Sequence, residues 1–321
     1  MRAWLGLIAA CAIACGGARA PDSLRLALNW FPEPEHGGYL AGVVHGLFAE
    51  RGLTVEIRPG GPGVPVVPRV ASREVDFGVV NADDVVAARA AGVPVTALLA
   101  PIHRSPWCVM VHARSGIERL ADLRDLTLAM QAGTPALAWL EQHVPLENVR
   151  IVPYSGSVAA FLASGRYAQQ AYVFSEPIIA AARGGDPRCL PIADIGFDPY
   201  ASVLVTSEAL LRERPDVVRA MTEASARGWE RYLGDPGPTH AHIHSVDPTI
   251  DRDVLDRAAD ALRPLVLDDA ARRDGVGSMQ LARWAELVRQ MGEVGAIGDA
   301  LDPTALFDDR FVPLPPSGPH R

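Results

Sequence analysis

The sequence contains no lysine, so all 30 of its Lys and Arg side chains are arginines. A coding bias of the genome is the simplest explanation for this absence. The chemical consequence holds whatever its origin, because a chain without lysine cannot form a lysine Schiff base with a carbonyl substrate. The composition therefore excludes enzymes whose reaction begins on a lysine imine.

Charge and short motifs exclude further classes of function. A net charge of −8 argues against a nucleic-acid partner. There is no nucleophile elbow, dinucleotide fingerprint or phosphate-binding loop, since residues 60–63 (GGPG) lack the required lysine and spacing. No cysteine or carboxylate completes a metal-ligand pattern around His240, His242 and His244, so a solvated surface helix is expected there. We predict no metal, no cofactor and no nucleic acid.

Cysteine is scarce, and two of the four cysteines lie in an N-terminal segment that we predict to be a lipoprotein signal. Residues 1–20 combine an early positive charge with an apolar run that is too short to span a bilayer. Cys15 follows a lipobox-like stretch and is the expected lipid anchor, whereas Cys11 would leave a very short apolar region. Residues 18–20 (ARA) offer an ordinary cleavage site instead, but Pro21 would follow the cut. Both alternatives predict export.

Cys108 and Cys189 are the cysteines that remain in the mature chain. In an oxidising compartment such a pair can form a disulfide. Both also lie in apolar, strand-like surroundings, where buried free cysteines are common. The sequence leaves the two states open. Neither the number nor the spacing of these cysteines indicates a metal site.

The most informative stretch of the chain covers residues 26–57. A short apolar strand leads into an irregular loop at residues 29–38, and an apolar-faced helix and a second strand follow. This order favours parallel strands with a right-handed crossover. The loop then lies at the carboxyl end of its strand, where open α/β sheets bind ligands. We therefore expect it to form one wall of a small-molecule cleft.

The rest of the chain predicts an α/β protein with two doubly wound lobes. At 321 residues it is too long for one compact core. Alternating strands and helices continue to about residue 200, and the remainder is mostly helical. We assign residues 21–104 and 205–321 to the first lobe and residues 105–204 to the second. Two crossings would join the lobes, as in receptors that close by a hinge.

Several short motifs resemble the periplasmic substrate-binding proteins of ABC importers, in the formylaminopyrimidine and sulfonate/nitrate branch. They follow one another in the same order over roughly residues 24–235. The motifs are residues 28–38 (LNWFPEPEHGG), residues 46–55 (GLFAERGLTV), residues 75–78 (VDFG), residues 90–95 (AAGVPV), and Gly165 with Glu176 and Pro177 eleven residues later.

This resemblance implies a type II periplasmic-binding-protein fold, in which two crossover strands join the lobes and a ligand cleft lies between them. It also implies that the protein is the extracytoplasmic solute-binding component of an ABC import system. Its partners would be an ABC permease and its ATPase. The location would be the periplasm or cell envelope, with membrane attachment through the lipid anchor. We expect a monomer that takes a small planar nitrogen-containing ligand, such as a thiamine pyrimidine precursor.

The same branch includes fungal enzymes that make the thiamine pyrimidine from pyridoxal phosphate and one of their own histidines. Val80 and Asp84 stand where those enzymes place their lysine and donor histidine. Their cysteine-rich iron stretch has no counterpart around residues 197–205. We therefore interpret the chain as a receptor and not an enzyme. The alternatives are an enzyme of pyrimidine metabolism on the same fold, or the periplasmic partner of a two-component sensor.

On the first lobe, the candidate ligand-binding residues follow two strands. Trp30 can stack on a planar ring or cover the sheet edge. Asn29 and His36 can hydrogen-bond a ligand, or cap the turn and hold the loop. Asn81 and Asp83 should face the cleft from the next strand, while the neighbouring Asp84 is better suited to a helix cap.

On the second lobe, Glu176 is the main candidate, because a carboxylate can accept two hydrogen bonds from an amine; helix-terminal charge placement is the alternative. Gln131 precedes a helix start whose N–H groups suit an oxygen. Tyr154 could stack from the opposite wall. Three other aromatic residues fit either core or rim: Tyr172, Phe174 and Tyr200. Because acidic candidates outnumber basic ones, we expect a neutral or amine-bearing ligand and not a sulfonate or nitrate.

Overall fold

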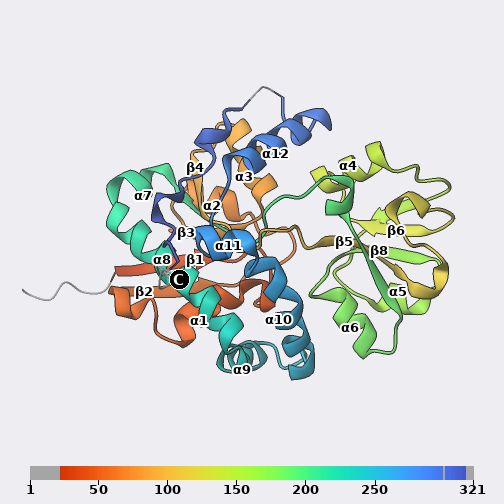
Figure 1. The fold of residues 1–321 in the computed structure, drawn as a ribbon, viewed down its shortest axis with the longest axis horizontal. Coiled ribbons are helices and arrows are strands. Elements are labelled where there is room, and N and C mark those ends of the chain that lie inside the picture. Colours follow the sequence, from red (N-terminus) through yellow and green to blue (C-terminus); the bar gives the residue numbers. More distant parts are fainter. Residues whose placement is uncertain (1–21, 299–300, 316–321) are drawn as a thin grey trace, which may run out of the picture.

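The structure, a computed structural model, describes residues 22–298 and 301–315. The predicted signal segment and the predicted anchor Cys15 lie outside these residues. Two five-stranded sheets, each with its own helices, form the two lobes. The second lobe is the yellow and green half on the right of Figure 1. Within the described ranges, no helix combines the length and apolar character needed to cross a bilayer.

The first sheet has the strand order β2-β1-β3-β10-β4. β1 runs parallel to β2 and β3, as the sequence predicts. β10 is antiparallel to both β3 and β4, because the chain enters it on returning from the second lobe. The sheet is therefore mixed, and the predicted boundary at residues 204 and 205 falls inside β10. The strands are β1 (Asp22–Ala27), β2 (Leu53–Arg58), β3 (Phe77–Val80), β4 (Val95–Leu99) and β10 (Val203–Ser207).

The second sheet repeats this plan with the order β7-β6-β8-β5-β9. β6 is parallel to β7 and β8, and β5 is antiparallel to β8 and β9. The carboxyl ends of β6 and β8 therefore lie at one edge of this sheet. The strands are β5 (Trp107–His112), β6 (Thr127–Met130), β7 (Arg150–Pro153), β8 (Tyr167–Tyr172) and β9 (Pro187–Pro191).

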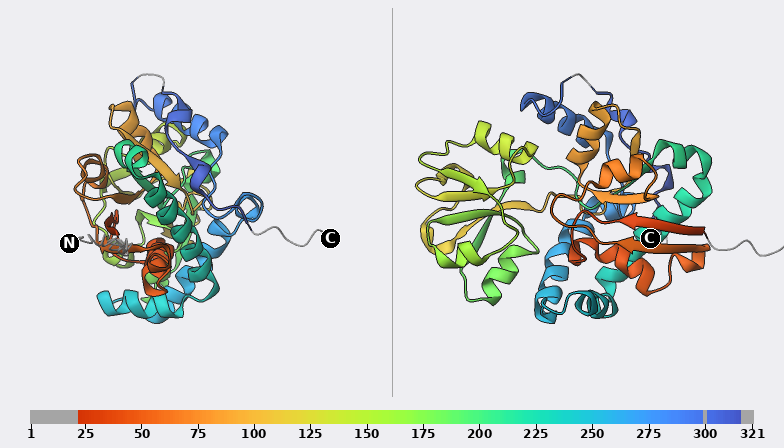
Figure 2. Two further views of the ribbon diagram at one scale, coloured as in Figure 1. Left: turned by 90° about the vertical axis from the view of Figure 1, so that its left-hand side faces the viewer. Right: turned by 180° about the vertical axis from the view of Figure 1, so that it is seen from behind.

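Helices cover both sheets, and most of the C-terminal ones belong to the first lobe (Figures 1 and 2). The α-helices are α1 (Gly37–Val44), α2 (Val66–Ala71), α3 (Ala82–Ala90), α4 (Pro135–His143), α5 (Ala159–Ala163), α6 (Glu176–Ala182), α7 (Glu208–Glu213), α8 (Pro215–Gly234), α9 (Gly237–Val246), α10 (Arg252–Val266), α11 (Asp269–Asp274) and α12 (Leu281–Glu293). The short 3₁₀ helices are Pro34–His36, Ala49–Arg51, Ala113–Ser115, Leu120–Asp122, Ile192–Ile195, Pro303–Ala305 and Asp309–Phe311.

Close packing of α1 on α8 positions the loop at residues 29–38. Gly228 of α8 has no room for a side chain, since an added Cβ would lie 2.2 Å from the carbonyl oxygen of Gly38. A Cβ at Gly38 would lie 2.2 Å from the indole of Trp229. Gly38 is thus explained by the close approach of α8, whose Trp229 indole fills the space that a side chain at position 38 would need, and Gly228 by the backbone of α1.

The two crossings between the lobes lie side by side. Ile102 of one crossing and Ala201 of the other form an antiparallel bridge, in which Ala201 N donates to Ile102 O at 3.1 Å. α12 supports the second crossing, because Gln290 Nε2 donates to Gly196 O at 2.8 Å and Arg283 donates to Asp198 O at 2.7 Å. These contacts hold the side of the molecule on which a hinge would turn.

Two local expectations are corrected. α3 begins after Asn81, not after Asp83 or Asp84; Asp84 instead accepts a hydrogen bond from the Asn81 backbone N at 3.0 Å. The helix around His240 is not simply a solvated one. His240 is 2% exposed and lies between Tyr232 Oη, 3.0 Å from its Nε2, and Asp256 Oδ1, 2.8 Å from its Nδ1.

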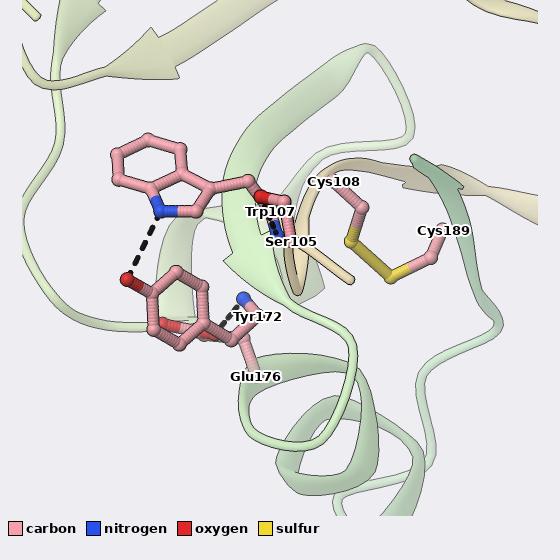
Figure 3. Close-up of a disulfide and its surroundings, with 6 residues drawn as sticks. All are labelled: Ser105, Trp107, Cys108, Tyr172, Glu176 and Cys189. Atoms are coloured by element: carbon pink, nitrogen blue, oxygen red, sulfur yellow. Dashed lines mark hydrogen bonds between the residues drawn. A yellow bond between two sulfur atoms is a disulfide. The ribbon is translucent and has the colours of Figure 1, made fainter. Parts of the chain in front are cut away.

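The second lobe contains a disulfide between Cys108 of β5 and Cys189 of β9, which settles the question that the sequence leaves open (Figure 3). The two strands are hydrogen-bonded neighbours, and the Cα atoms lie 5.5 Å apart. The bond therefore fixes the edge strand β9 to the strand that begins at Trp107.

We expect Cys108→Ala with Cys189→Ala to lower the free energy of unfolding by about 2–4 kcal/mol, because the unfolded chain loses a long-range cross-link. Urea unfolding with and without dithiothreitol measures the effect. The reductant should destabilise the parent protein and leave the double variant unchanged. Equal unfolding midpoints for the oxidised parent and the double variant would contradict the prediction.

Candidate ligand-binding site between the lobes

The loop at residues 29–38 is shaped by hydrogen bonds among its own side chains. Asn29 Nδ2 donates to Glu35 Oε1 at 3.2 Å, and Asn29 Oδ1 lies 2.8 Å from His36 Nε2. Glu35 and His36 are both buried, at 1% and 0% exposure. Burial lowers the pKa of His36 to about 3, so the imidazole is neutral and its Nε2–H donates to Asn29. Asn29 and His36 thus hold the loop, which was the alternative to ligand contact.

Trp30 points from this loop toward the second lobe. A Cβ built on Gly156 would lie 3.7 Å from the Trp30 indole, so the ring reaches the turn after β7. Phe31 packs edge-to-face on Trp30, with ring centroids 5.6 Å apart. The indole keeps part of its surface accessible. It can therefore offer a flat face between the two lobes.

Glu176 of the second lobe lies in the first turn of α6. Its Oε1 accepts a hydrogen bond from Tyr154 Oη. Its Oε2 accepts one from Tyr172 N at 2.8 Å, and Figure 3 shows these two residues side by side. The preceding residue, Ser175, places its Oγ 3.5 Å from Glu33 Oε2 of the first lobe. The carboxylates of Glu33 and Glu176 thus approach each other from the two lobes.

A second set of contacts joins the lobes through Tyr172. Its phenolic oxygen accepts hydrogen bonds from Asn81 Nδ2 at 3.0 Å and from Trp107 Nε1 at 2.9 Å. Figure 3 shows the Trp107 indole directed at the Tyr172 hydroxyl. Asn81 Oδ1 is buried and has no hydrogen-bond partner within the described residues. Asn81 therefore contacts the second lobe with one end of its amide and keeps the other end unused.

The acidic residues here retain accessible surface although they lie deep in the protein. Burial, the charge of Glu35 and the charge of Glu176 raise the pKa of Glu33 well above its usual value. Burial and neighbouring Asp84 raise the pKa of Asp83 to about 7. Burial also raises the pKa of Glu176. We call the region where the two lobes meet at these side chains the interlobe recess. Its residues are Trp30, Glu33, Asn81, Asp83, Trp107, Tyr154, Tyr172 and Glu176.

Hydrogen bonds link Asn81, Tyr154 and Glu176 through Tyr172. Trp30 reaches the second lobe at Gly156, two residues from Tyr154. Asp83 lies near Tyr172, whose pKa is raised by burial first and by the charges of Glu35 and Asp83 as well. Gln131 is different. Its backbone N donates to Gln170 Oε1 at 2.6 Å, its side chain is exposed, and no hydrogen bond within the described residues links it to the others.

Three aromatic residues that fitted core or rim are now placed. Phe174 and Tyr200 are buried at 1% and 3% exposure, and Tyr172 borders the recess.

Sequence reasoning missed Glu33 and Trp107. The position of Glu33, three residues after Trp30 in the same loop, was an available signal. Trp107 gave a weaker one, since it only begins the strand that follows a crossing.

Two α/β lobes joined by paired crossings, with side chains from both meeting between them, define a periplasmic-binding-protein fold. The periplasmic aliphatic sulphonate-binding protein of Escherichia coli has the same architecture. The two structures align with a TM-score of 0.70, covering 94% of this chain and 98% of that one. Sequence identity is 14%, so the similarity concerns the fold alone.

The chain belongs to the NMT1/THI5-like family, whose model matches residues 33–238. The formylaminopyrimidine-binding protein of Halalkalibacterium halodurans is 27% identical over 68% of this chain and 68% of its own length. The riboflavin-binding protein of Chloroflexus aurantiacus is 23% identical over 91% of this chain and 86% of its own length. The resemblance found in the sequence is therefore confirmed.

We expect Tyr172→Phe to reduce the free energy of unfolding by about 1–3 kcal/mol, because Asn81 and Trp107 lose their shared acceptor. Urea unfolding measures the loss. Tyr167→Phe is the matched control, since Tyr167 lies on the same strand and its hydroxyl makes no hydrogen bond within the described residues. The prediction is wrong if both variants unfold at the midpoint of the parent protein.

We expect thermal stability to fall as pH rises from about 5 to about 8. Burial raises the pKa of Glu35 from 4.5 to about 7, so the folded state binds this proton more tightly than the unfolded state. The contribution of Glu35 to the free energy of unfolding is complete below its pKa in the unfolded chain and is lost as the pH rises through its pKa in the folded protein. Calorimetry at a series of pH values measures it.

In Glu35→Gln the loss of stability with pH should be smaller. The control is Glu213→Gln, which removes an exposed carboxylate that pairs with Arg73 at 2.6 Å. An identical pH dependence in Glu35→Gln and in the control would count against the assignment.

Proposed function

We propose that this protein is the extracytoplasmic solute-binding component of an ABC importer and captures a small planar nitrogen-containing molecule between its lobes. The observation that supports this most is that Trp30 of the first lobe reaches Gly156, two residues from Tyr154, whose hydroxyl donates to Glu176 of the second lobe. Two relatives named for binding formylaminopyrimidine and riboflavin, both planar heterocycles, point the same way.

In this proposal Trp30 stacks on the ring of the solute. Glu176 accepts hydrogen bonds from an exocyclic amine, because each carboxylate oxygen has a lone pair beyond the one used by Tyr154 or Tyr172. Asn81 and Asp83 complete the polar contacts from the first lobe. Closure of the lobes on the solute signals a permease and its ATPase, and a lipid anchor at Cys15 keeps the protein at the membrane.

The rival function is an enzyme on the same fold, as in the fungal synthases that the sequence also resembles. Val80 and Asp84 occupy the positions expected for the lysine and donor histidine of those enzymes, and no lysine is present elsewhere. The imine that begins their reaction therefore has no amine to form on. A sensor partner would share the binding site, and neighbouring permease and ATPase genes distinguish it from an importer component.

Native mass spectrometry of protein purified without denaturation tests the proposed function by weighing what is bound. Calorimetry with formylaminopyrimidine, riboflavin and an alkanesulfonate then compares the solute classes. Binding of a heterocycle without turnover supports the receptor. Appearance of a product on incubation would support the enzyme, and tight binding of only the alkanesulfonate would refute the preference for a nitrogen heterocycle.

We expect Trp30→Ala to weaken binding of the heterocycle that co-purifies by about tenfold or more, a loss of about 1.4 kcal/mol. The physical reason is the removal of the stacking face. Trp30→Phe keeps an aromatic face and should lose less affinity, which separates stacking from a general disturbance of the loop. Calorimetry gives both affinities, and an unchanged affinity in Trp30→Ala would remove the indole from the site.

A further inference from the structure

The interlobe recess contains carboxylates with no positive partner. Glu33, Asp83 and Glu176 border it, and Glu35 and Asp84 lie near enough to add to the effect of burial in raising the pKa of Glu33 and Asp83 respectively. Within the described residues, none of the five forms an ion pair or accepts a hydrogen bond from an arginine.

Elsewhere in the protein acidic side chains are commonly paired. Asp194 accepts from Arg104 at 2.6 Å, and Glu213 accepts from Arg73 at 2.6 Å. These pairs are exposed, where an unpaired carboxylate would be solvated by water in any case. Glu35 is buried and Glu33, Asp83 and Glu176 are partly buried, yet none of them is paired with a cation. Keeping these carboxylates ionised costs free energy unless a cation binds beside them.

The other titratable groups at the recess cannot supply it. Burial lowers the pKa of His36 to about 3, so it is neutral. Burial and nearby carboxylates raise the pKa of Tyr154 and of Tyr172, so both stay neutral as well. The sequence has no lysine that could swing into the recess. Two things can therefore neutralise these carboxylates: protons, which the raised pKa values of Glu33, Asp83 and Glu176 favour, or a cation from outside the chain that displaces those protons.

The walls of the recess also suit a cation. Trp30 offers an indole face, and the rings of Trp107 and Tyr172 lie 5.7 Å apart at 64° (Figure 3). Indole and phenol faces attract cations through the ring quadrupole. Independently of the carboxylates, the buried Asn81 Oδ1 is an acceptor without a donor within the described residues. Acceptors, carboxylates and aromatic faces together match a flat molecule that carries positive charge and donors.

We propose that the solute is a planar organic cation, held by Glu33, Asp83 and Glu176 and stacked on Trp30. This inference rests on the proposed solute-binding function and narrows its ligand class from nitrogen heterocycles in general to those that bind in a positively charged form.

The test compares ring systems that differ by one N-methyl group and its charge. The probes are 1-methylnicotinamide against nicotinamide and 1-methylquinolinium against quinoline, with nicotinate as the anionic control. Calorimetry and tryptophan fluorescence report binding to the full-length mature protein. We expect each cation to bind about tenfold or more tighter than its neutral partner. Failure of both cations to bind at millimolar concentration, or neutral partners that bind as tightly, would overturn the inference.

Variants distinguish the contribution of the carboxylate charges from that of the Trp30 stacking face. Glu33→Gln and Glu176→Gln should each reduce the preference for the cation over its neutral partner, whereas Trp30→Ala should weaken both members of a pair. The exposed Glu213→Gln is the matched control and should leave the preference unchanged. A preference that survives both recess variants would contradict the assignment of these carboxylates.

Proton release gives a second readout. Because the pKa of Asp83 and that of Glu35 are near 7, a bound cation should lower them and expel protons at neutral pH. Binding enthalpies in buffers of different ionisation enthalpy measure the number released, and a neutral partner should release fewer. If native mass spectrometry finds a neutral heterocycle bound tightly without turnover, the cation inference fails and the proposed function stands. Turnover would remove both.

Discussion

The buried contact of Asn29 with Glu35 and His36 is the interaction on which the candidate site depends. Three polar side chains, two of them buried, are hydrogen-bonded to one another inside a loop whose only regular structure before α1 is the 3₁₀ turn Pro34–His36. Removing any member would leave a buried polar group without a partner. While this contact is intact, Trp30 and Glu33 project toward the second lobe. The loop therefore holds in position the residues that face the recess.

Local pattern was sufficient to predict much of the fold. The alternating strands and helices of both lobes follow from apolar runs separated by glycine and cap residues. The reversed strand β10 could not be found this way, because its direction depends on where the chain re-enters the first lobe after a long excursion. The pairing of Cys108 with Cys189 likewise depends on strand register across 81 residues.

The same distinction between local patterns and long-range contacts applies to the site. Trp30 and Glu176 were recognisable because each stands at a strand end within a motif. The roles of Asn29 and His36 could not be predicted from the sequence. The same two side chains could form hydrogen bonds to a ligand or within the loop, and the sequence does not distinguish the two cases. Tyr172 and Asn81 meet across 91 positions in the sequence, and no local signal records such a contact. Glu33 becomes a candidate only from the structure, in which Ser175 and Glu176 lie beside it.

The disulfide of the second lobe has a consequence for biogenesis. Thiols generally stay reduced in a cytoplasm, so a bond between Cys108 and Cys189 is typical of a protein that matures in an oxidising compartment. Until the bond forms, hydrogen bonds and packing alone hold the edge strand β9 to β5. Under the export proposed above, the chain would cross the membrane before this cross-link forms, which makes the chain easier to keep unfolded. Once formed, the bond limits how far the second lobe can unfold again.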